Sequence, residues 1–173
     1  MLTRRQLLTG ALAALAVAPA ANGQPAPGHA VRAWRRGKAA PVLDLVDLDD
    51  AAWRLADQRG RMVLLNFWAI WCEPCVAEMA SLEALSAKGQ VGVMGVNYKQ
   101  TAPAIRRHLA LHPVNYPMLR DSSGDAFKAW TDGILPTTVI VDAKGMPRGS
   151  VVGEFDWAGP EADRVIASLG ATR

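Results

Sequence analysis

The chain contains two cysteines, Cys72 and Cys75, and both stand in the short sequence W-C-E-P-C. An apolar run precedes them, and a stretch with helical periodicity follows. A thiol at the start of a helix lies close to unpaired backbone N–H groups and to the positive end of the helix dipole, which favour the thiolate. We therefore predict that Cys72 attacks a substrate disulfide and that Cys75, one turn further along, resolves the mixed disulfide. Pro74 fits this position because the first helical turn has no N–H partner to lose.

Two other uses of a Cys-x-x-Cys pair have to be weighed. It can form half of a zinc site, which His108 and His112 could complete. The spacer between Cys75 and His108 is far longer than that of a zinc finger, so we expect no metal and place both histidines at the surface. A purely structural disulfide is the second alternative, but so short a loop restricts the unfolded chain little. The reaction we favour needs no cofactor besides the Cys72–Cys75 disulfide.

The elements around the cysteines alternate between strands and helices. We predict strands at 42–46, 62–69, 91–97, 116–119, 137–142 and 150–152, and helices at 73–88, 101–111, 125–130 and 160–169. The apolar run 62–69, interrupted by Asn66 alone, suits a central strand that is buried on both faces. The alternation predicts a parallel core, and the short link between the last two strands requires an antiparallel hairpin. The expected fold class is therefore α/β, with a mixed central sheet flanked by helices.

A second motif, G-I-L-P-T-T at residues 133–138, places Pro136 directly before an apolar strand. Alone, it would mark the start of a strand, where a missing N–H is tolerated. Together with the W-C-E-P-C turn it resembles the cis-proline loop of the thioredoxin superfamily. That resemblance implies that Leu135 and Pro136 face the dithiol and present backbone groups to a partner chain.

Residues 41–170 more closely resemble the TlpA/ResA-like branch of extracytoplasmic thioredoxin-like proteins. The matching segments are L-L-N-F-W-A-I-W-C-E-P-C-V-A-E-M, G-V-N, Y-P-M-L-R-D and L-P-T-T-V-I-V-D. The resemblance implies a thioredoxin fold with an N-terminal β-hairpin and an inserted helix-strand unit near 101–119. It also implies reduction of disulfides in exported proteins, often in cytochrome c or oxidase maturation, with re-reduction by a membrane electron donor. Ala80 departs from the branch, because many relatives have proline there.

Glu78 is the candidate proton carrier. Asn66 occupies the strand position where thioredoxin itself has an aspartate, so the acid must come from elsewhere. Glu78 lies one turn after Cys75 on the apolar side of the helix, where an unpaired carboxylate is costly and its pKa rises. Such an acid can relay a proton to or from a thiol. The alternative is an exposed glutamate that bends away to water.

Residues beside and between the cysteines, together with one residue of the G-I-L-P-T-T motif, are expected to contact the substrate: Trp71, Glu73, Pro74 and Leu135. Glu73 disfavours a nearby thiolate, which favours a reductant, although the helix dipole acts in the opposite direction. For Trp71, packing is the alternative role. A disulfide-forming oxidant, a thiol peroxidase and a copper-binding module that uses both thiolates remain alternative functions.

The N-terminus predicts export. In residues 1–20, Arg4 and Arg5 precede an apolar stretch that ends in A-P-A, which is typical of a signal peptide and resembles a twin-arginine signal. The stretch is short for a membrane-spanning helix, so an uncleaved anchor is the less favoured alternative. We expect a periplasmic or otherwise extracytoplasmic protein that is soluble after cleavage.

The remaining chain divides into a linker at 21–40 and one thioredoxin-like domain at 41–173. The linker carries a basic cluster of Arg32, Arg35, Arg36 and Lys38, which we expect to be solvated, with contact to an anionic membrane as the alternative. The chain has 19 basic and 16 acidic residues, so without Arg4 and Arg5 the balance is 17 minus 16. A charge near +1 gives no electrostatic argument for a nucleic-acid partner. We expect a monomer that exchanges disulfides with exported proteins.

Overall fold

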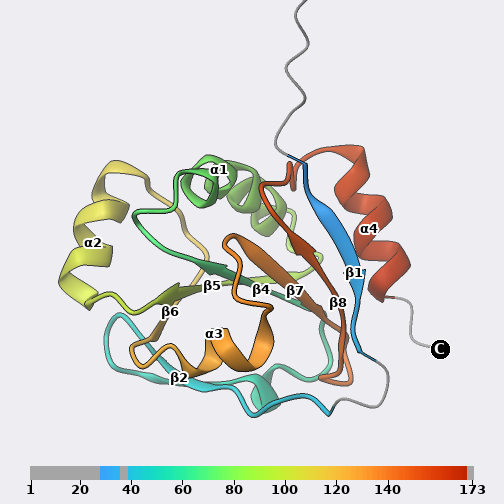
Figure 1. Cartoon of the computed structure of the whole chain (residues 1–173), viewed down its shortest axis with the longest axis horizontal. Helices are drawn as coiled ribbons and strands as arrows, with labels where there is room; N and C mark the ends of the chain where they lie inside the picture. Colours follow the sequence, from blue (N-terminus) through green and yellow to red (C-terminus); the bar gives the residue numbers. More distant parts are fainter. Residues whose placement is uncertain (1–27, 36–38, 171–173) are drawn as a thin grey trace, which may run out of the picture.

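The computed structural model describes residues 28–35 and 39–170, which form one eight-stranded sheet with helices on both faces (Figure 1). The strand order is β1-β8-β7-β4-β5-β6-β2-β3. The strands are β1 (Ala30–Ala33), β2 (Asp44–Asp47), β3 (Ala52–Arg54), β4 (Val63–Trp68), β5 (Gly92–Tyr98), β6 (Met118–Asp121), β7 (Thr137–Val141) and β8 (Pro147–Val152). The helices are α1 (Glu73–Ala87), α2 (Ala102–Leu111), α3 (Asp125–Trp130) and α4 (Pro160–Gly170), with a short 3₁₀ helix η1 (Leu55–Gln58).

The sheet is mixed, as the sequence predicted. Strands β4, β5 and β6 run parallel to one another, while β7 is antiparallel to β4 and β8 is antiparallel to β7. Strands β2 and β3 form the predicted N-terminal hairpin, and β2 also pairs with β6. The inserted unit that the family resemblance implied is present as α2 and β6. The predicted α/β class is confirmed.

Strand β4 lies in the middle of the sheet, and all six of its side chains are buried. Because side chains alternate along a strand, Leu64 and Trp68 face one layer of helices while Leu65 and Phe67 face the other. Asn66 shares the face of Leu64 and Trp68. This alternation points the one polar side chain of the strand toward α1, where the cysteines lie.

Helices cover the two faces of the sheet unequally (Figure 1). On one face, α1, α2 and α4 bury apolar side chains such as Leu82, Ile105 and Val165 together with both cysteines. On the other face, α3 packs Phe127 and Trp130 against the sheet, with η1 beside it. The disulfide therefore lies on the more heavily covered face.

The start and the end of α1 follow from local chemistry. Cys72 occupies the N-cap position in an extended conformation, and Pro74 lies in the first turn, where its missing N–H costs nothing. Helical geometry ends at Ala87, and Gly89 follows with a φ of +69°, a conformation that glycine adopts easily. The helix predicted at 73–88 is confirmed, with its end one residue earlier.

The linker prediction for residues 21–40 is wrong at residues 30–33. This segment forms β1, which pairs antiparallel with β8 and adds an edge strand to the sheet. All four residues of β1 are exposed, so the sequence contains no alternating apolar pattern that would predict a strand there. The strand is held by its backbone pairing with β8. The domain accordingly begins before residue 41.

The expected signal segment 1–20 lies outside the described residues. None of the helices between residues 28 and 170 that the structure describes combines the length and apolarity that crossing a membrane requires.

Candidate active site

The two cysteines form a disulfide at the N-terminus of α1, with their Cα atoms 5.2 Å apart. The backbone N–H groups of Cys75 and Val76 donate to the carbonyl of Cys72 at 3.0 and 3.2 Å, which closes the first helical turn. Cys72 keeps 6% of its surface exposed, whereas Cys75 keeps none. Of the two sulfurs, that of Cys72 is therefore the one that a partner can approach.

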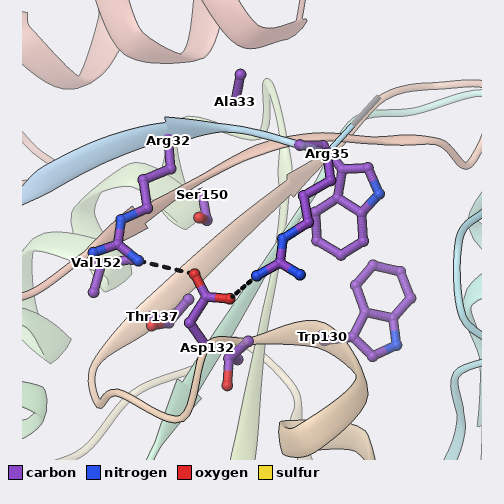
Figure 2. A pocket seen from close by; sticks show the side chains of 10 residues that line it. Arg32, Ala33, Arg35, Trp130, Asp132, Thr137, Ser150 and Val152 are labelled. Carbon is purple, nitrogen blue, oxygen red and sulfur yellow. Dashed lines mark hydrogen bonds and ion pairs between the residues drawn. The ribbon is translucent and has the colours of Figure 1, made fainter. Parts of the chain in front are cut away.

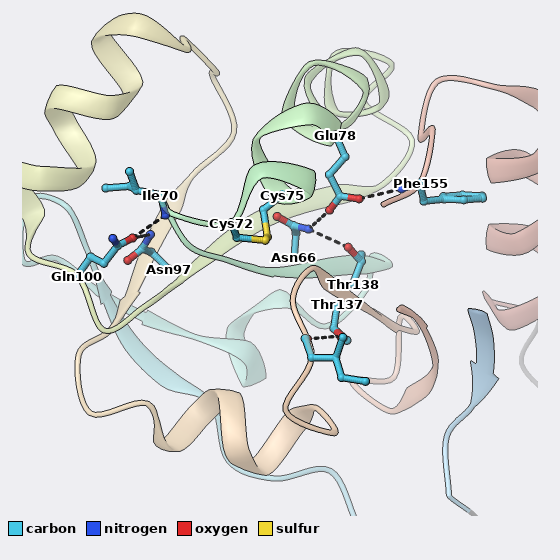
Figure 3. Close-up of a disulfide and its surroundings, with 11 residues drawn as sticks. Asn66, Ile70, Cys72, Cys75, Glu78, Asn97, Gln100, Thr137, Thr138 and Phe155 are labelled. Atoms are coloured by element: carbon cyan, nitrogen blue, oxygen red, sulfur yellow. Dashed lines mark hydrogen bonds between the residues drawn. A yellow bond between two sulfur atoms is a disulfide. The ribbon is translucent and has the colours of Figure 1, made fainter. Parts of the chain in front are cut away.

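A polar contact from β5 holds the turn that precedes Cys72. The side-chain oxygen of Gln100 accepts hydrogen bonds from the backbone N–H of Ile70 at 2.8 Å and from the side chain of Asn97 at 2.9 Å. This bridge fixes the strand-to-helix turn from the neighbouring strand (Figure 3). Sequence reasoning missed Gln100, and its only signal was a polar residue after the end of a buried strand.

The Leu135–Pro136 peptide bond is cis, and the loop that contains it is held on both sides. The Pro136 carbonyl accepts the N–H of Gly153 at 2.9 Å, and the Thr137 hydroxyl donates to the carbonyl of Ile134 at 2.7 Å. Pro136 is buried and Leu135 is half-buried. Leu135 reaches the surface groove that also contains Cys72.

That groove is mostly apolar and runs beside the disulfide. Its lining residues are Trp71, Cys72, Glu73, Pro74, Tyr98, Phe127, Gly133 and Leu135. Trp71 is 67% exposed at the rim, while the rings of Tyr98 and Phe127 pack at 4.6 Å. All four residues predicted to contact substrate therefore line one groove. Tyr98 and Phe127, which come from β5 and α3, were not predicted, because nothing local in the sequence links them to the cysteines.

Glu78 is buried beside the disulfide, with 2% of its surface exposed. Its carboxylate accepts a hydrogen bond from the Asn66 amide at 2.6 Å and another from the backbone N–H of Phe155 at 3.1 Å. The same Asn66 amide donates to the Thr138 hydroxyl at 2.9 Å (Figure 3). Glu78 therefore does not bend away to water, which was the alternative that the sequence left open. The sequence analysis gave Asn66 no part in the site beyond replacing an aspartate. In the structure, its amide binds the carboxylate of Glu78.

Burial raises the pKa of Glu78 to about 8. The hydrogen bonds from Phe155 and Asn66 act in the opposite direction, because they stabilise the charged carboxylate, and they offset only part of the effect. Glu78 lies three residues after Cys75 on one helix, so the two side chains lie on the same face. A group that is protonated at neutral pH and titrates near pH 8 can hold or release a proton next to a thiol.

The two histidines of the alternative zinc site lie on α2 and at its end. Their rings stack at 4.6 Å, and the ring of His108 lies 5.6 Å from that of Trp68. His108 is half-buried, so its surface placement was wrong, and burial lowers its pKa. Within residues 28–35 and 39–170, no group of three or more potential metal ligands gathers in one place.

Known proteins share both the sequence and the fold of this chain. The model of the AhpC/TSA family matches residues 36–148. The thiol-disulfide oxidoreductase ResA of Geobacillus kaustophilus is 32% identical over 120 residues, which cover 68% of this chain and 69% of that protein. The chain belongs to the AhpC/TSA family and to its ResA-like thiol-disulfide oxidoreductases. Its substrates are accordingly protein thiols and disulfides.

Solved structures agree with this ResA-like assignment at the level of the fold. A thiol:disulfide interchange protein of the thioredoxin family from Chlorobium tepidum superposes with a TM-score of 0.64 at 24% identity, covering 78% of this chain and 97% of that one. StoA from Bacillus subtilis gives a TM-score of 0.60 at 21% identity, covering 69% and 93%. The predicted thioredoxin fold is confirmed.

Proposed function

We propose that this ResA-like protein is an exported reductant that opens disulfides in other exported proteins. One observation carries the direction of electron flow. Among the described residues that line the groove around Cys72, Glu73 has the only charged side chain. No cationic side chain from the described part of the chain lines this groove, and Glu73 places one carboxylate next to Cys72 in the chain, which disfavours the Cys72 thiolate and makes the dithiol more reducing.

The exchange begins at Cys72, whose thiolate attacks one sulfur of a substrate disulfide. A new bond forms between that sulfur and Cys72, and the other substrate sulfur leaves as a thiolate. Cys75 then attacks the Cys72 sulfur, releasing the second substrate thiol and forming the Cys72–Cys75 disulfide. Two electrons pass from the dithiol to the substrate, so no bound cofactor is required.

Glu78 handles the proton in the second step. Cys75 is shielded from water, so a thiol there needs a neighbouring base to become a thiolate. Glu78 in its charged form takes that proton, and its burial beside Asn66 and Phe155 keeps its pKa near that of a thiol. Proton transfer between groups of similar pKa has little energetic cost.

The groove and the cis-proline loop form the docking surface. Trp71 offers an exposed apolar ring, and Leu135 lies opposite the helix start that carries Glu73 and Pro74. A substrate segment next to a disulfide can cover these side chains while its sulfur reaches Cys72. Aromatic residues of this kind supply much of the binding energy at protein interfaces.

The cellular setting is part of the same proposal. The N-terminal pattern of paired arginines and an apolar stretch supports export. The resemblance to the TlpA/ResA-like branch supports a role in cytochrome c or oxidase maturation and re-reduction by a membrane electron donor. We expect the protein to act as a monomer.

The reduction potential tests the direction. The protein is equilibrated in glutathione or dithiothreitol buffers, and the state of Cys72 and Cys75 is determined by mass. We expect a value close to that of thioredoxin, about −270 mV. A value near about −120 mV would instead make the protein an oxidant, and it would contradict the proposed direction while leaving the fold and the exchange chemistry intact.

A further inference from the structure

Strand β1 contacts the loop that carries Leu135 and Pro136 through a cluster of charges (Figure 2). Arg32 donates to one carboxylate oxygen of Asp132 at 2.8 Å, and Arg35 donates to the other at 3.1 Å. Asp132 stands three residues before Leu135 and next to Gly133, which lines the groove. Residues about one hundred positions apart in the sequence thus meet beside the docking loop.

Two guanidinium groups share one carboxylate in this cluster. Each of the two carboxylate oxygens of Asp132 accepts one arginine, and a pocket of about 150 Å³ lies between β1 and the loop. Because both arginines bind the same carboxylate from a different part of the chain, we interpret the cluster as a clamp within the chain. Trp34 of the same segment packs on Trp130 of α3 at 5.7 Å, which adds an apolar contact behind the ion pairs.

Leu135 packs against the core clusters on both faces of the sheet, and the Pro136 carbonyl binds Gly153, while the hydrogen bonds of Thr131 are local. Thr131 donates its hydroxyl to the carbonyl of Phe127 at 2.7 Å and accepts the N–H of Gly133 at 3.1 Å. These contacts hold the shape of the turn. The ion pairs of Arg32 and Arg35 with Asp132 add a connection between the exposed part of the loop and the edge of the sheet.

The pairing of β1 with β8 requires a glycine in β8. Arg32 pairs with Ser150, and Ala33 pairs with Gly149. A Cβ atom at Gly149 would lie 2.5 Å from the backbone oxygen of Arg32, so a larger residue would push the strand away. The position of the two arginines over the loop therefore depends on a glycine in a different strand.

The same segment also reaches the loop that binds Glu78. The ring of His29 lies 4.4 Å from the ring of Phe155, whose N–H donates to Glu78. His29 also lies 3.3 Å from Glu161 of α4. The segment 28–35 consequently spans both loops that flank the disulfide.

We propose that residues 30–35, which comprise β1 and the two residues after it, are a strap that sets the position of the docking loop, with Arg32 and Arg35 as positioning residues that act through Asp132. The inference rests on the proposed function of the groove. A partner protein that docks on Leu135 needs the loop in one place, whereas a small disulfide needs only the sulfur of Cys72. Loosening the strap therefore weakens exchange with proteins and leaves exchange with small molecules unchanged.

The test compares the double variant Arg32→Gln/Arg35→Gln with a matched control, Arg54→Gln/Arg107→Gln. The control removes the same charge from two exposed arginines on β3 and α2. With insulin as the protein disulfide, we expect KM to rise about 2- to 5-fold in the strap variant, the range that exposed ion pairs support, with kcat unchanged. Oxidised glutathione as substrate and the reduction potential should give wild-type values. Replacement of both arginines by lysine should restore part of the lost affinity.

Hydrogen exchange of the amides at residues 133–135 provides a readout that does not depend on any substrate. We expect these amides to exchange about 2- to 5-fold faster in Asp132→Asn than in wild type, with no change in α1. Unchanged exchange in the loop would overturn the strap, and so would an equal loss of rate with insulin and glutathione. If wild type exchanges with glutathione but does not reduce insulin, the proposed reductant function fails, and the amide exchange alone decides the strap.

Discussion

Two regions flank the disulfide, and they are built in opposite ways. On the α1 side, Glu78 and Asn66 are buried between helix and sheet, and each hydrogen bond of the network joins groups in a dry interior. On the other side, the loop at residues 131–136 exposes Asp132 and Ile134, and Asp132 forms surface ion pairs with Arg32 and Arg35. The comparison separates two requirements: a proton carrier needs exclusion of water to shift its pKa, and a docking loop needs exposure to reach a partner.

The energies of the two regions differ for the same reason. An exposed ion pair contributes about 1 kcal/mol or less, because water and salt screen it. Burial that raises the pKa of a carboxyl group by several units changes the free-energy difference between its protonated and charged forms by several kcal/mol. Variants of the buried region should therefore have larger effects than variants of the loop.

The cysteines join both regions, and their removal has the largest expected effect. Cys72→Ser should abolish exchange, because Cys72 is the less buried of the two cysteines and supplies the attacking sulfur. Cys75→Ser should still attack but should accumulate a mixed disulfide with the substrate, since the resolving thiol is missing. Mass spectrometry of both variants after incubation with oxidised insulin separates the two roles. A stable adduct on Cys72→Ser in place of Cys75→Ser would reverse the assignment.

Glu78 should make the oxidised protein less stable as the pH rises. Its pKa is about 8 in the folded protein and about 4.5 in the unfolded chain, so the folded state holds the proton through that window. The free energy of unfolding should be highest below pH 4.5 and should fall by roughly 5 kcal/mol as the pH rises to 8. Urea unfolding at pH 5 and pH 8 measures this slope, which Glu78→Gln should flatten.

The matched control for that slope is Glu83→Gln on the same helix. Hydrogen bonds from Asn115 lower the pKa of Glu83, so its contribution changes only as the pH falls below the ordinary range of a carboxyl. This variant should keep the wild-type slope between pH 5 and pH 8. An equal slope in wild type and Glu78→Gln would show that the buried carboxylate does not titrate there.

The exchange rate should also depend on Glu78. Loss of a general acid or base costs about 10²-fold or more in rate, and we expect Glu78→Gln to slow resolution by Cys75 by that order. The pH profile of the rate should lose the step near pH 8 as well. Stopped-flow measurement of resolution with a preformed mixed disulfide at Cys72 tests this directly, and an unchanged rate and thiol titration would remove Glu78 from the mechanism.

Trp71 should give the smallest effect of this series, and one confined to protein substrates. Trp71→Ala should raise KM for insulin about 5-fold, as expected for loss of one exposed aromatic contact, while stability and the rate with glutathione stay the same. Leu111→Ala on α2, which removes another exposed apolar side chain far from the groove, is the control. Equal effects of the two variants would place the docking surface elsewhere.

Much of the site could be predicted because its signals are local. The run 62–69, the turn with Cys72 and Cys75 and the position of Glu78 on the apolar side of the helix all lie within one strand-turn-helix segment. Periodicity within such a segment determines which side chains share a face. The burial of Asn66 and Glu78 follows from the same two periods, and both are observed.

The strap and the long-range contacts of the site could not be predicted in this way. Strand β1 has no buried residue, and its pairing with β8 depends on the absence of a side chain at Gly149, which nothing in the sequence links to residues 30–33. Phe155 binds Glu78 through its backbone N–H. Because nearly every residue type has this group, the identity of residue 155 does not predict the contact. Gln100 and Phe127 approach the cysteines only through the arrangement of the strands.

By itself, the sequence predicted the α/β fold class, the cysteine pair at the start of a helix and the burial of Glu78, because hydrophobic periodicity and residue type can be read from neighbouring positions. Only the tertiary structure decided that Asp132 meets Arg32 and Arg35, and that the Phe155 N–H meets Glu78. These contacts join residues that lie far apart along the chain, and their distances depend on strand order and register. A single sequence records the residue types at such contacts, but not which of them meet.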